Sequence, residues 1–581
     1  MGMAGNSRGW VRTVLRTGVC LVMLLLAAEV VSAEAGSDAN AACASCHRAI
    51  YERYRRTPMS NASGSAAAGF MPARFDHGAS GVSYRIEEEN GRVWLRFERK
   101  PEVGATAAEM AGQAMKGERE LRYFLGSGRR GRTYLFEDQG YWFEIPINWY
   151  AKKQVWDMAP NYQRALEMPL TLRVDPGCLR CHASGAQANL PEARNKYAGE
   201  PFTDGGITCV ACHGDARAHV ASGGKTAMLK LGELTPAKRD SVCLNCHLEG
   251  QAAVVHGGKR LVDFRPGESI FDYASFFVHR SEAGSGGRAT SQWEALLQSA
   301  CKRGAGDRLT CTTCHDPHGS DEQKTESERV AWYRGKCLGC HDAEASGKPG
   351  VGLAGFGRTH HAENPDCASC HMPRATSNDI AHEQVTDHRI VRFASGKVVP
   401  PATSGPLVLV GPTERSESAS DRDLGLAYAQ MAARGDREAG MRAVELLRAA
   451  EKAPEASLDH ELHAQLGFLD QVSGDREGAA REYAAALTAD GNDSFAAGNL
   501  ALLAARAHRY EEAAKLLERA FEDDPAATAA GMNLAVVDCG LGRREAALGT
   551  LERILEFSPD SGEALALKHA IVSGEHSCGT R

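Results

Sequence analysis

Fourteen of the eighteen cysteines occur in pairs with one fixed spacing. Two residues separate the cysteines of each pair, and a histidine follows the second cysteine directly. Thiols at this spacing can add to the two vinyl groups of a porphyrin, and the adjacent imidazole can then bind the iron. The pattern predicts seven covalent c-type haems. The attachment cysteines are Cys43, Cys46, Cys178, Cys181, Cys209, Cys212, Cys243, Cys246, Cys311, Cys314, Cys337, Cys340, Cys367 and Cys370, and the proximal iron ligands are His47, His182, His213, His247, His315, His341 and His371.

Two other chemistries use paired cysteines. Zinc ribbons take two pairs per ion, but seven pairs is an odd number, and zinc does not require a histidine after every pair. A thioredoxin-like redox motif would occur once, within a βαβ unit. Seven repeats of the full motif favour haem over both.

Four cysteines stand outside the pattern, namely Cys20, Cys301, Cys539 and Cys578. Cys20 lies in the expected signal peptide described below and should be lost with it. Three then remain, so at least one is unpaired within the chain. Their spacing matches no cysteine motif, so we predict no chemical role for them.

The number of second iron ligands decides what such haems can do. An iron with ligands on both faces transfers electrons, whereas an iron with one open face can bind and reduce a small molecule. Nine histidines outside the motifs precede residue 400: His77, His219, His256, His279, His318, His360, His361, His382 and His388. They suffice for seven irons, so the composition does not force an open site.

The first 33 residues predict export. Arg8, Arg12 and Arg16 precede an apolar run, and Val31-Ser32-Ala33 resembles a signal-peptidase site. The alternative is an uncleaved membrane anchor, but the run is short and Glu29 interrupts it. We expect a signal peptide at residues 1–33 and a mature protein that is exported, to the periplasm or beyond the cell, or held at a membrane through partners.

The length and net charge of the chain limit which kinds of protein it can be. A chain of 581 residues suggests two to four domains, and 43% hydrophobic residues exclude a mostly disordered protein. A net charge of -7 argues against a strongly basic nucleic-acid binder.

The seven motifs are unevenly distributed. The first is separated from the second by a segment with alternating apolar residues at 82–86 and 93–97 around Asn90-Gly91, a hairpin signal. We expect a haem domain at 34–394 with a small antiparallel sheet inserted at about 75–150. The other six motifs follow closely, with room only for short helices and loops, so the porphyrins themselves would form much of the core.

A Pro-, Gly- and Ser-rich stretch at 395–420 predicts a linker, and residues 421–581 repeat with a period of 34. Equivalent positions carry Leu466, Leu500 and Leu534; Gly467, Ala501 and Ala535; Ala479, Ala513 and Ala547; and Tyr483, Leu517 and Leu551. This spacing is typical of tetratricopeptide repeats, and 562–571 fits a capping helix. Generic alanine-rich helices would not keep three units in register. These residues hold 17 basic and 28 acidic side chains.

The haem region resembles exported multihaem cytochromes c of the hydroxylamine oxidoreductase and nitrite reductase type, including their tetrahaem electron-carrying relatives. The matching pieces are Gly206-Ile207-Thr208-Cys209 through His213-Gly214 with His219 beyond, Cys314-His315-Asp316-Pro317-His318, and Cys370-His371-Met372-Pro373 with His388 downstream. Chains of this kind fused to tetratricopeptide repeats are also similar. The resemblance implies a mainly α protein in which a multihaem domain with little regular structure precedes an α-solenoid.

The resemblance also implies second iron ligands. His219, His318 and His388 match such ligands by position, as does one of His360 and His361. After the first motif the family often carries a histidine about a dozen residues on, whereas Met59 stands there in this chain. A thioether ligand would raise the potential of the haem that it binds, which need not be the first. The alternative is that Met59 is an exposed loop residue.

Function follows as an expectation. The nitrite reductases carry a Cys-x-x-Cys-Lys motif, which does not occur in this sequence. This favours an electron carrier over an enzyme, with the repeats docking a redox partner protein and with no membrane span after signal cleavage. One alternative is a multihaem oxidoreductase acting on a small nitrogen or sulfur compound at one open-faced haem. Another is a binding protein whose haems are a sensing or structural core.

Overall fold

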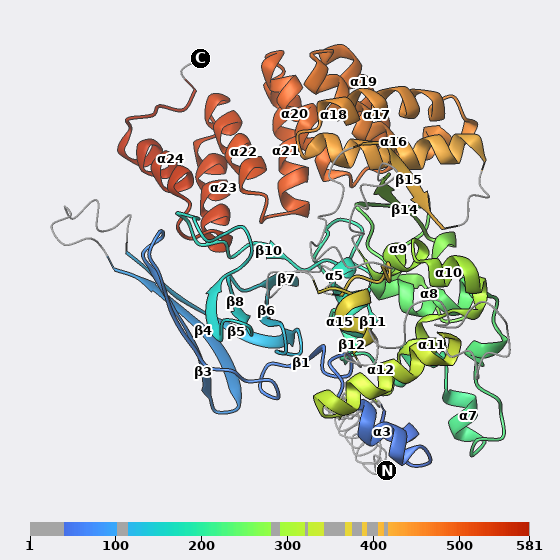
Figure 1. The fold of residues 1–581 in the computed structure, drawn as a ribbon. Helices are drawn as coiled ribbons and strands as arrows, with labels where there is room; N and C mark the ends of the chain where they lie inside the picture. The colour runs from blue at the N-terminus through green and yellow to red at the C-terminus, as the bar shows by residue number, and fades with distance from the viewer. Residues whose placement is uncertain are drawn as a thin grey trace, which may run out of the picture.

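The computed structural model describes residues 40–100, 114–280, 291–319, 324–341, 366–374, 386–391, 405–411 and 416–579. The expected signal peptide and His360, His361 and His382 lie outside these residues. Helices and antiparallel strands both contribute substantially to the described structure, and a long series of helices ends the chain (Figure 1).

A large antiparallel sheet lies between the first and second motifs. It runs in the order β10-β7-β6-β5-β4-β3-β2, with β1 paired to β5 and with β8 joining β6 to β9. Its strands are β1 (Ser63–Ser65), β2 (Ala73–His77), β3 (Val82–Glu89), β4 (Arg92–Arg99), β5 (Met115–Leu125), β6 (Gly131–Asp138), β7 (Tyr141–Glu144), β8 (Ile147–Tyr150), β9 (Val155–Met158) and β10 (Leu172–Arg173). The expected antiparallel sheet is therefore present, but its strands extend from residue 63 to residue 173.

The predicted hairpin joins β3 and β4. Asn90 and Gly91 both have positive φ, 54° and 76°, as the tight turn between twisted strands requires. Buried residues alternate along β3, so Val82, Tyr84 and Ile86 point into the core.

Each haem motif lies on or beside a short helix. One turn places the two cysteines, three residues apart, and the histidine that follows on the same face. The helices that carry motifs are α2 (Ala41–Ala44), α5 (Pro176–His182), α6 (Cys209–His213), α8 (Pro236–His247), α11 (Cys311–Cys314), α12 (Glu326–His341) and α15 (Cys367–His371). Other helices of this region are α3 (Arg48–Tyr54), α7 (Arg217–Ala221), α9 (Gln292–Leu297) and α10 (Ala300–Ala305), and strands β11 (Ala183–Ala186) and β12 (Phe202–Gly205) pair beside them.

A three-stranded antiparallel sheet joins distant parts of the chain. It consists of β13 (Ala252–Val255), β14 (Ala274–His279) and β15 (Leu407–Val410), in that order. Strand β15 lies within the segment expected to be a linker. That segment is therefore anchored to the haem region at β15.

The helices after this sheet form antiparallel pairs. They are α16 (Glu417–Ala433), α17 (Arg437–Ala450), α18 (His460–Ser473), α19 (Arg476–Ala489), α20 (Ser494–Arg506), α21 (Tyr510–Asp523), α22 (Thr528–Gly540), α23 (Arg544–Phe557) and α24 (Gly562–Ser573). A Cβ on Gly467 would lie 2.7 Å from the Tyr483 ring, which explains why small residues recur where the paired helices cross.

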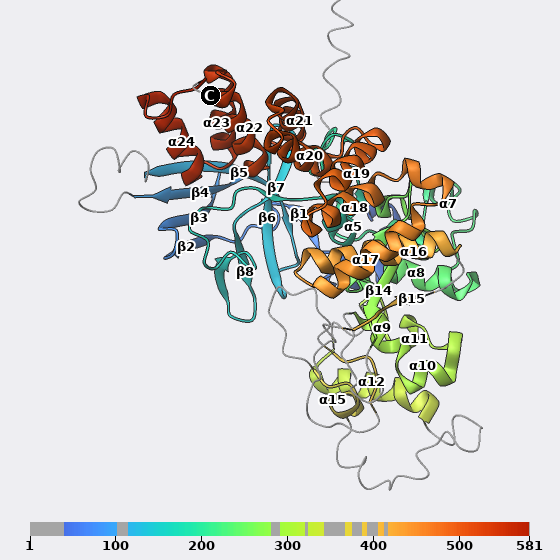
Figure 2. The ribbon, with the colours of Figure 1, turned by 90° about the horizontal axis from the view of Figure 1, so that it is seen from above.

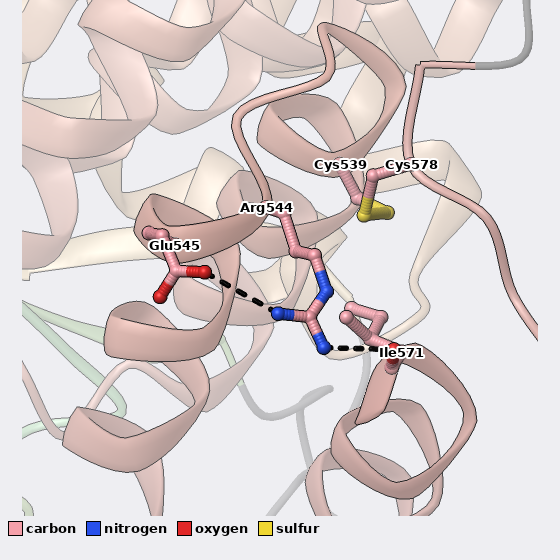
Figure 3. Close-up of a disulfide and its surroundings, with 5 residues drawn as sticks. All are labelled: Cys539, Arg544, Glu545, Ile571 and Cys578. Atoms are coloured by element: carbon pink, nitrogen blue, oxygen red, sulfur yellow. Dashed lines mark hydrogen bonds and ion pairs between the residues drawn. A yellow bond between two sulfur atoms is a disulfide. The ribbon is translucent and has the colours of Figure 1, made fainter. Parts of the chain in front are cut away.

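A disulfide closes the C-terminal end of the repeats. Cys539 on α22 is fully buried and is bonded to Cys578 in the tail beyond α24 (Figure 3). Arg544 on α23 contacts Glu545 and donates a hydrogen bond to the carbonyl oxygen of Ile571 on α24. The capping helix is thus attached to the last repeat by a covalent and a polar link.

The repeats pack along both the large sheet and the haem region, as the two views show (Figures 1 and 2). Phe557 at the end of α23 lies 5.8 Å from the Phe143 ring and belongs to the core of the sheet. The Arg173 guanidinium lies 2.6 Å from the Asp524 carboxylate across the same contact. The repeats and the sheet therefore share a hydrophobic core. Among the described helices, none is both long and apolar enough to cross a bilayer.

Candidate haem sites

Motifs far apart in the sequence lie together in space. The Arg180 guanidinium of the second motif donates a 3.2 Å hydrogen bond to the Asn245 side chain of the fourth. The thiols of Cys181 and Cys246 each contact a backbone oxygen of the other motif, at 3.8 and 3.6 Å. These contacts bring the second and fourth attachment sites side by side.

The first and third motifs also adjoin. The Asn40 side chain accepts a 2.8 Å hydrogen bond from the Cys209 backbone N–H, and the Tyr54 hydroxyl donates to the Ile207 carbonyl oxygen at 2.6 Å. Gly206 has a positive φ of 66°, and a Cβ there would lie 2.1 Å from the Ser60 carbonyl oxygen. Glycine therefore permits the close approach between the third motif and the segment that follows the first.

Three motif histidines face a histidine from another segment. His47 faces His219, with ring centres 6.4 Å apart and planes 14° apart. His213 faces His318 at 6.1 Å and 7°. His315 faces His388 at 6.2 Å and 33°. The structure thus brings His219, His318 and His388 to the first, third and fifth motifs.

These separations suit an iron held between two imidazoles. A metal–imidazole bond is about 2.0–2.1 Å long, and each ring centre lies about 1 Å beyond its ligating nitrogen, which gives a centre-to-centre distance of about 6 Å for two rings on one metal. Direct ring stacking would bring the centres closer.

Hydrogen bonds orient the second histidine of each pair. The Nδ1 atom of His219 lies 2.7 Å from the Thr226 carbonyl oxygen, and that of His388 lies 2.8 Å from the Thr386 carbonyl oxygen. His318 Nδ1 lies 3.2 Å from an Asp316 carboxylate oxygen. A hydrogen bond at Nδ1 fixes the tautomer and leaves Nε2 to bind a metal.

Two motif histidines have similar support. His371 Nδ1 lies 2.7 Å from the Val391 carbonyl oxygen. His315 Nδ1 lies 3.3 Å from the hydroxyl oxygen of Tyr333, a residue of the helix that carries the sixth motif. No sequence pattern indicated the Tyr333 contact, because only the tertiary structure brings α12 against the fifth motif.

Burial favours the neutral form of several of these imidazoles. It lowers the pKa of His213, and the neighbouring His318 and His47 lower it further. Burial likewise lowers the pKa of His388 and of His247, and His388 adds to the effect at His247. A neutral imidazole is the form that binds a metal.

The described side chains fit haem better than zinc. A zinc site needs four converging ligands, but the group of potential ligands that converges in the described part of the chain is Glu451, His463 and Glu482, which contains no cysteine. Four buried N–H groups in the haem region have no acceptor among the described residues: Arg53 Nε, Arg180 Nε, Trp293 Nε1 and Trp332 Nε1. The carboxylate arms of a porphyrin are acceptors that could satisfy such groups.

The remaining candidate histidines differ in their surroundings. His77 has both ring nitrogens engaged, with Ser80 and with the Gln163 carbonyl oxygen. His256 also has both engaged, with the Asp272 carbonyl oxygen and Ser275. His279 is bonded through Nδ1, to the Gly405 carbonyl oxygen at 2.7 Å. His77 and His256 are therefore poorly placed to bind iron, whereas His279 resembles the paired histidines.

Because His219 faces the first motif's histidine, Met59 stays a predicted iron ligand at another motif. Its side chain is half-buried, and its carbonyl oxygen accepts hydrogen bonds from the backbone N–H groups of Ile207 and Ala62. Met59 thus helps to hold the third motif against the segment after the first. Candidate ligand His361 lies outside the described residues.

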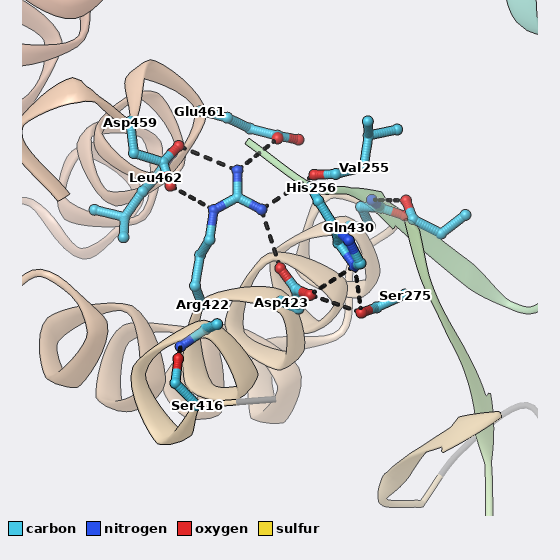
Figure 4. A network of polar contacts seen from close by, with 12 residues as sticks. Val255, His256, Ser275, Ser416, Arg422, Asp423, Gln430, Asp459, Glu461 and Leu462 are labelled. Carbon is cyan, nitrogen blue, oxygen red and sulfur yellow. Dashed lines mark hydrogen bonds and ion pairs between the residues drawn. The ribbon is translucent and has the colours of Figure 1, made fainter. Parts of the chain in front are cut away.

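A buried polar network joins the repeats to the haem region (Figure 4). The Asp423 carboxylate on α16 accepts a 2.6 Å hydrogen bond from the Ser275 hydroxyl and lies 3.4 Å from His256 Nε2. Arg422 contacts Asp423 at 3.0 Å and also pairs with Asp459 and Glu461.

Comparisons with known proteins match two separate parts of the chain. A family model described as "Cytochrome c554 and c-prime" matches residues 148–214, which contain the second and third motifs. A model described as "Tetratricopeptide repeat" matches residues 502–571. No curated protein sequence matches the chain.

Solved structures similar to the chain cover only part of it. "MamA AMB-1 C2221" is 21% identical, with a TM-score of 0.24, and the match covers 28% of this chain and 91% of that one. "Crystal structure of MamA" is 17% identical with a TM-score of 0.22, covering 24% and 80%. YrrB, described as a TPR protein with an unusual peptide-binding site, is 22% identical with a TM-score of 0.23, covering 26% and 74%.

Proposed function

We propose that this protein is an exported cytochrome that transfers electrons through seven covalently bound c-type haems. The observation that carries the proposal is the set of three imidazole pairs, each joining a motif histidine to a histidine from another segment at 6.1–6.4 Å. When bound, c-type haem supplies a one-electron iron couple. The residues would attach the porphyrins, close the iron faces and exclude water.

Mass spectrometry of the exported protein tests the haem count. The signal-cleaved chain should carry the added mass of seven haems. A chain carrying fewer haems, or bound zinc in their place, would contradict the proposal.

The repeats suggest a partner-binding role. Val472 on α18 and Val536 on α22 are 70% and 48% exposed, although both are apolar. We infer that the repeats dock a redox partner protein through exposed apolar residues such as these. Replacing both valines by aspartate should slow electron exchange with that partner and leave the haem spectra unchanged. An unchanged rate of electron exchange would show that the repeats do not dock the partner.

A second candidate function is an oxidoreductase with one open iron. Of the nine candidate second ligands, His77 and His256 are engaged by other groups, so seven histidines remain for seven irons. If every iron has a histidine as its second ligand, all seven histidines are needed, including the adjacent His360 and His361. If one of these histidines has another role, one iron either takes Met59 as its second ligand or keeps an open face that can bind a small nitrogen or sulfur compound.

Carbon monoxide binding distinguishes the two functions. Reduced protein whose haems are all low-spin and do not bind carbon monoxide is a carrier. A high-spin haem that binds it supports the oxidoreductase.

A further inference from the structure

Helix α16 binds the free edge of strand β13. Strand β14 pairs with the other edge, so the carbonyl groups of alternate β13 residues point away from the sheet. Gln430 donates to the Ala253 oxygen at 3.0 Å, and Arg422 to the Val255 oxygen at 3.1 Å. Arg434, just beyond α16, donates to the Gln251 oxygen at 3.3 Å. The first repeat helix thus satisfies an exposed strand edge.

One face of the three-stranded sheet packs against the repeats. Ala252 and Val254 of β13, Phe277 of β14 and Leu407 of β15 are buried in one core. That core also holds residues of α16, α17 and α18, among them Leu426, which is 1% exposed. The sheet is therefore covered on this side by α16, α17 and α18.

The opposite face packs against the fourth haem motif. Phe276 and Ala274 of β14 and Val410 of β15 share a second core with Leu244 and Leu248. Leu244 lies between the two cysteines of this motif, and Leu248 follows His247 directly. Both are almost fully buried, at 2% and 1% exposed. Adjacent residues Phe276 and Phe277 thus point to the motif and to the repeats.

We propose that the repeat domain is a positioning layer for the fourth haem. Helix α16 clamps β13, and the sheet transmits this restraint to Leu244 and Leu248, which flank His247. The inference rests on the proposed haem attachment at this motif. It gives the repeats a role within the chain, in addition to any partner that they bind.

The connection is short along the chain as well. Strand β13 begins five residues after His247. The network of Asp423, Ser275 and His256 fixes the end of the same strand. Interiors packed at crystal-like density transmit small shifts, so a loosened clamp should change the orientation of the His247 imidazole.

Redox titration of the full-length holoprotein tests the proposal. The variant Gln430→Ala/Arg434→Ala removes two of the carbonyl donors. It should shift one of the seven midpoint potentials and alter the paramagnetic resonance signal of that haem. Leu248→Val, beside His247, identifies the fourth haem, and the same component must move in both variants. Two single variants of Arg434 complete the test. Arg434→Ala should shift the same potential, whereas Arg434→Lys, which keeps a hydrogen-bond donor, should leave it at the wild-type value.

Arg506→Ala is the matched control. Arg506 is an exposed residue at the end of α20, so it lies at a helix end of a later repeat, and its replacement should move no potential. If the double variant does not fold, Gln430→Ala alone is titrated instead. Unchanged potentials in a folded variant, or equal shifts of all seven, would overturn the proposal. Fewer than seven haems in the wild-type mass would instead refute the proposed function.

Discussion

At the residue scale, the second histidine of each ring pair is the most consequential side chain. His318 replaced by methionine should raise the potential of one haem, because a thioether favours ferrous iron more than imidazole does. The shift is a fraction of the range of about 0.8 V that axial ligands span. A sulfur–iron charge-transfer band should appear with it in the oxidised protein.

His569→Met is the control for this prediction, because His569 is exposed on α24 in the repeats. It should leave every potential unchanged. An unaltered redox titration of His318→Met would show that His318 is not an iron ligand, despite its ring lying 6.1 Å from that of His213.

Tyr333 should tune the haem of the fifth motif. With Nε2 on iron, His315 carries its proton on Nδ1 and donates it to the Tyr333 oxygen, which increases the basicity of the ligand. Tyr333→Phe removes this acceptor and should raise one potential. A hydrogen bond worth about 0.5–1.5 kcal/mol corresponds to some tens of millivolts, because about 59 mV is a factor of ten for one electron.

Spectroelectrochemistry can measure this shift, with Tyr510→Phe in the repeats as the control. A lowered potential would reverse the assigned direction of the hydrogen bond.

At the element scale, the pair formed by α18 and α19 contains a buried titrating cluster. His463 Nδ1 lies 2.7 Å from a Glu482 carboxylate oxygen, and Arg448 contacts Glu482, Glu451 and Asp470. The hydrogen bond to Glu482 raises the pKa of His463. Burial raises the pKa of Glu482, but hydrogen bonds from His463 and Arg448 outweigh it and leave that pKa lowered.

The raised pKa of His463 makes the stability of the repeats depend on pH. The contribution of His463 to the free energy of unfolding is complete below its pKa in the unfolded chain, about 6.5. It is lost as the pH rises through the pKa of His463 in the folded protein. Each unit of difference corresponds to about 1.4 kcal/mol. Denaturant unfolding followed by the helical signal should show stability falling over this interval. His463→Gln should flatten the dependence, whereas a slope kept in this variant would assign the effect to another group.

The sequence predicted some elements well and others poorly, for physical reasons. The repeat helices follow from a 34-residue pattern of small and large residues, and the β3–β4 hairpin follows from Asn90-Gly91. The resemblance singled out His219, His318 and His388, but it could not predict which motif each one faces, because each lies in sequence beside one motif and in space beside the histidine of another. The roles of His77 and His256 could not be predicted, since the second partner of His77 is the distant Gln163 and both partners of His256 lie on another segment. The Cys539–Cys578 bond depends equally on tertiary packing.

At the scale of the whole molecule, the residues on either side of the expected linker pack together as one structural unit. Phe557 and Ala526 complete the core of the large sheet, and α16 covers β13. A chain ending at Gly411 should therefore retain covalent haem but expose Phe143 and Phe277.

Thermal unfolding and protease resistance test this prediction. The shortened chain should unfold at a lower temperature and be cut more readily. Phe557→Ala in the full chain should cost about 3–5 kcal/mol, as for other buried aromatic residues. A chain ending at Gly579 keeps all repeat helices and the Cys539–Cys578 disulfide, and serves as the control. An unchanged unfolding temperature for the Gly411 chain would restore the picture of two independent halves.

The pairing of β14 with β15 imposes an order on biosynthesis. Strand β14 ends at His279 and β15 begins at Leu407, so residues 280–406 emerge between them with the fifth, sixth and seventh motifs. The sheet cannot close, and α16 cannot cover its edge, until all three motifs have been made. Thioether formation needs thiols that a haem can reach. We therefore expect the last three haems to be attached to residues 280–406 while the three-stranded sheet is still open, before the repeats cover it.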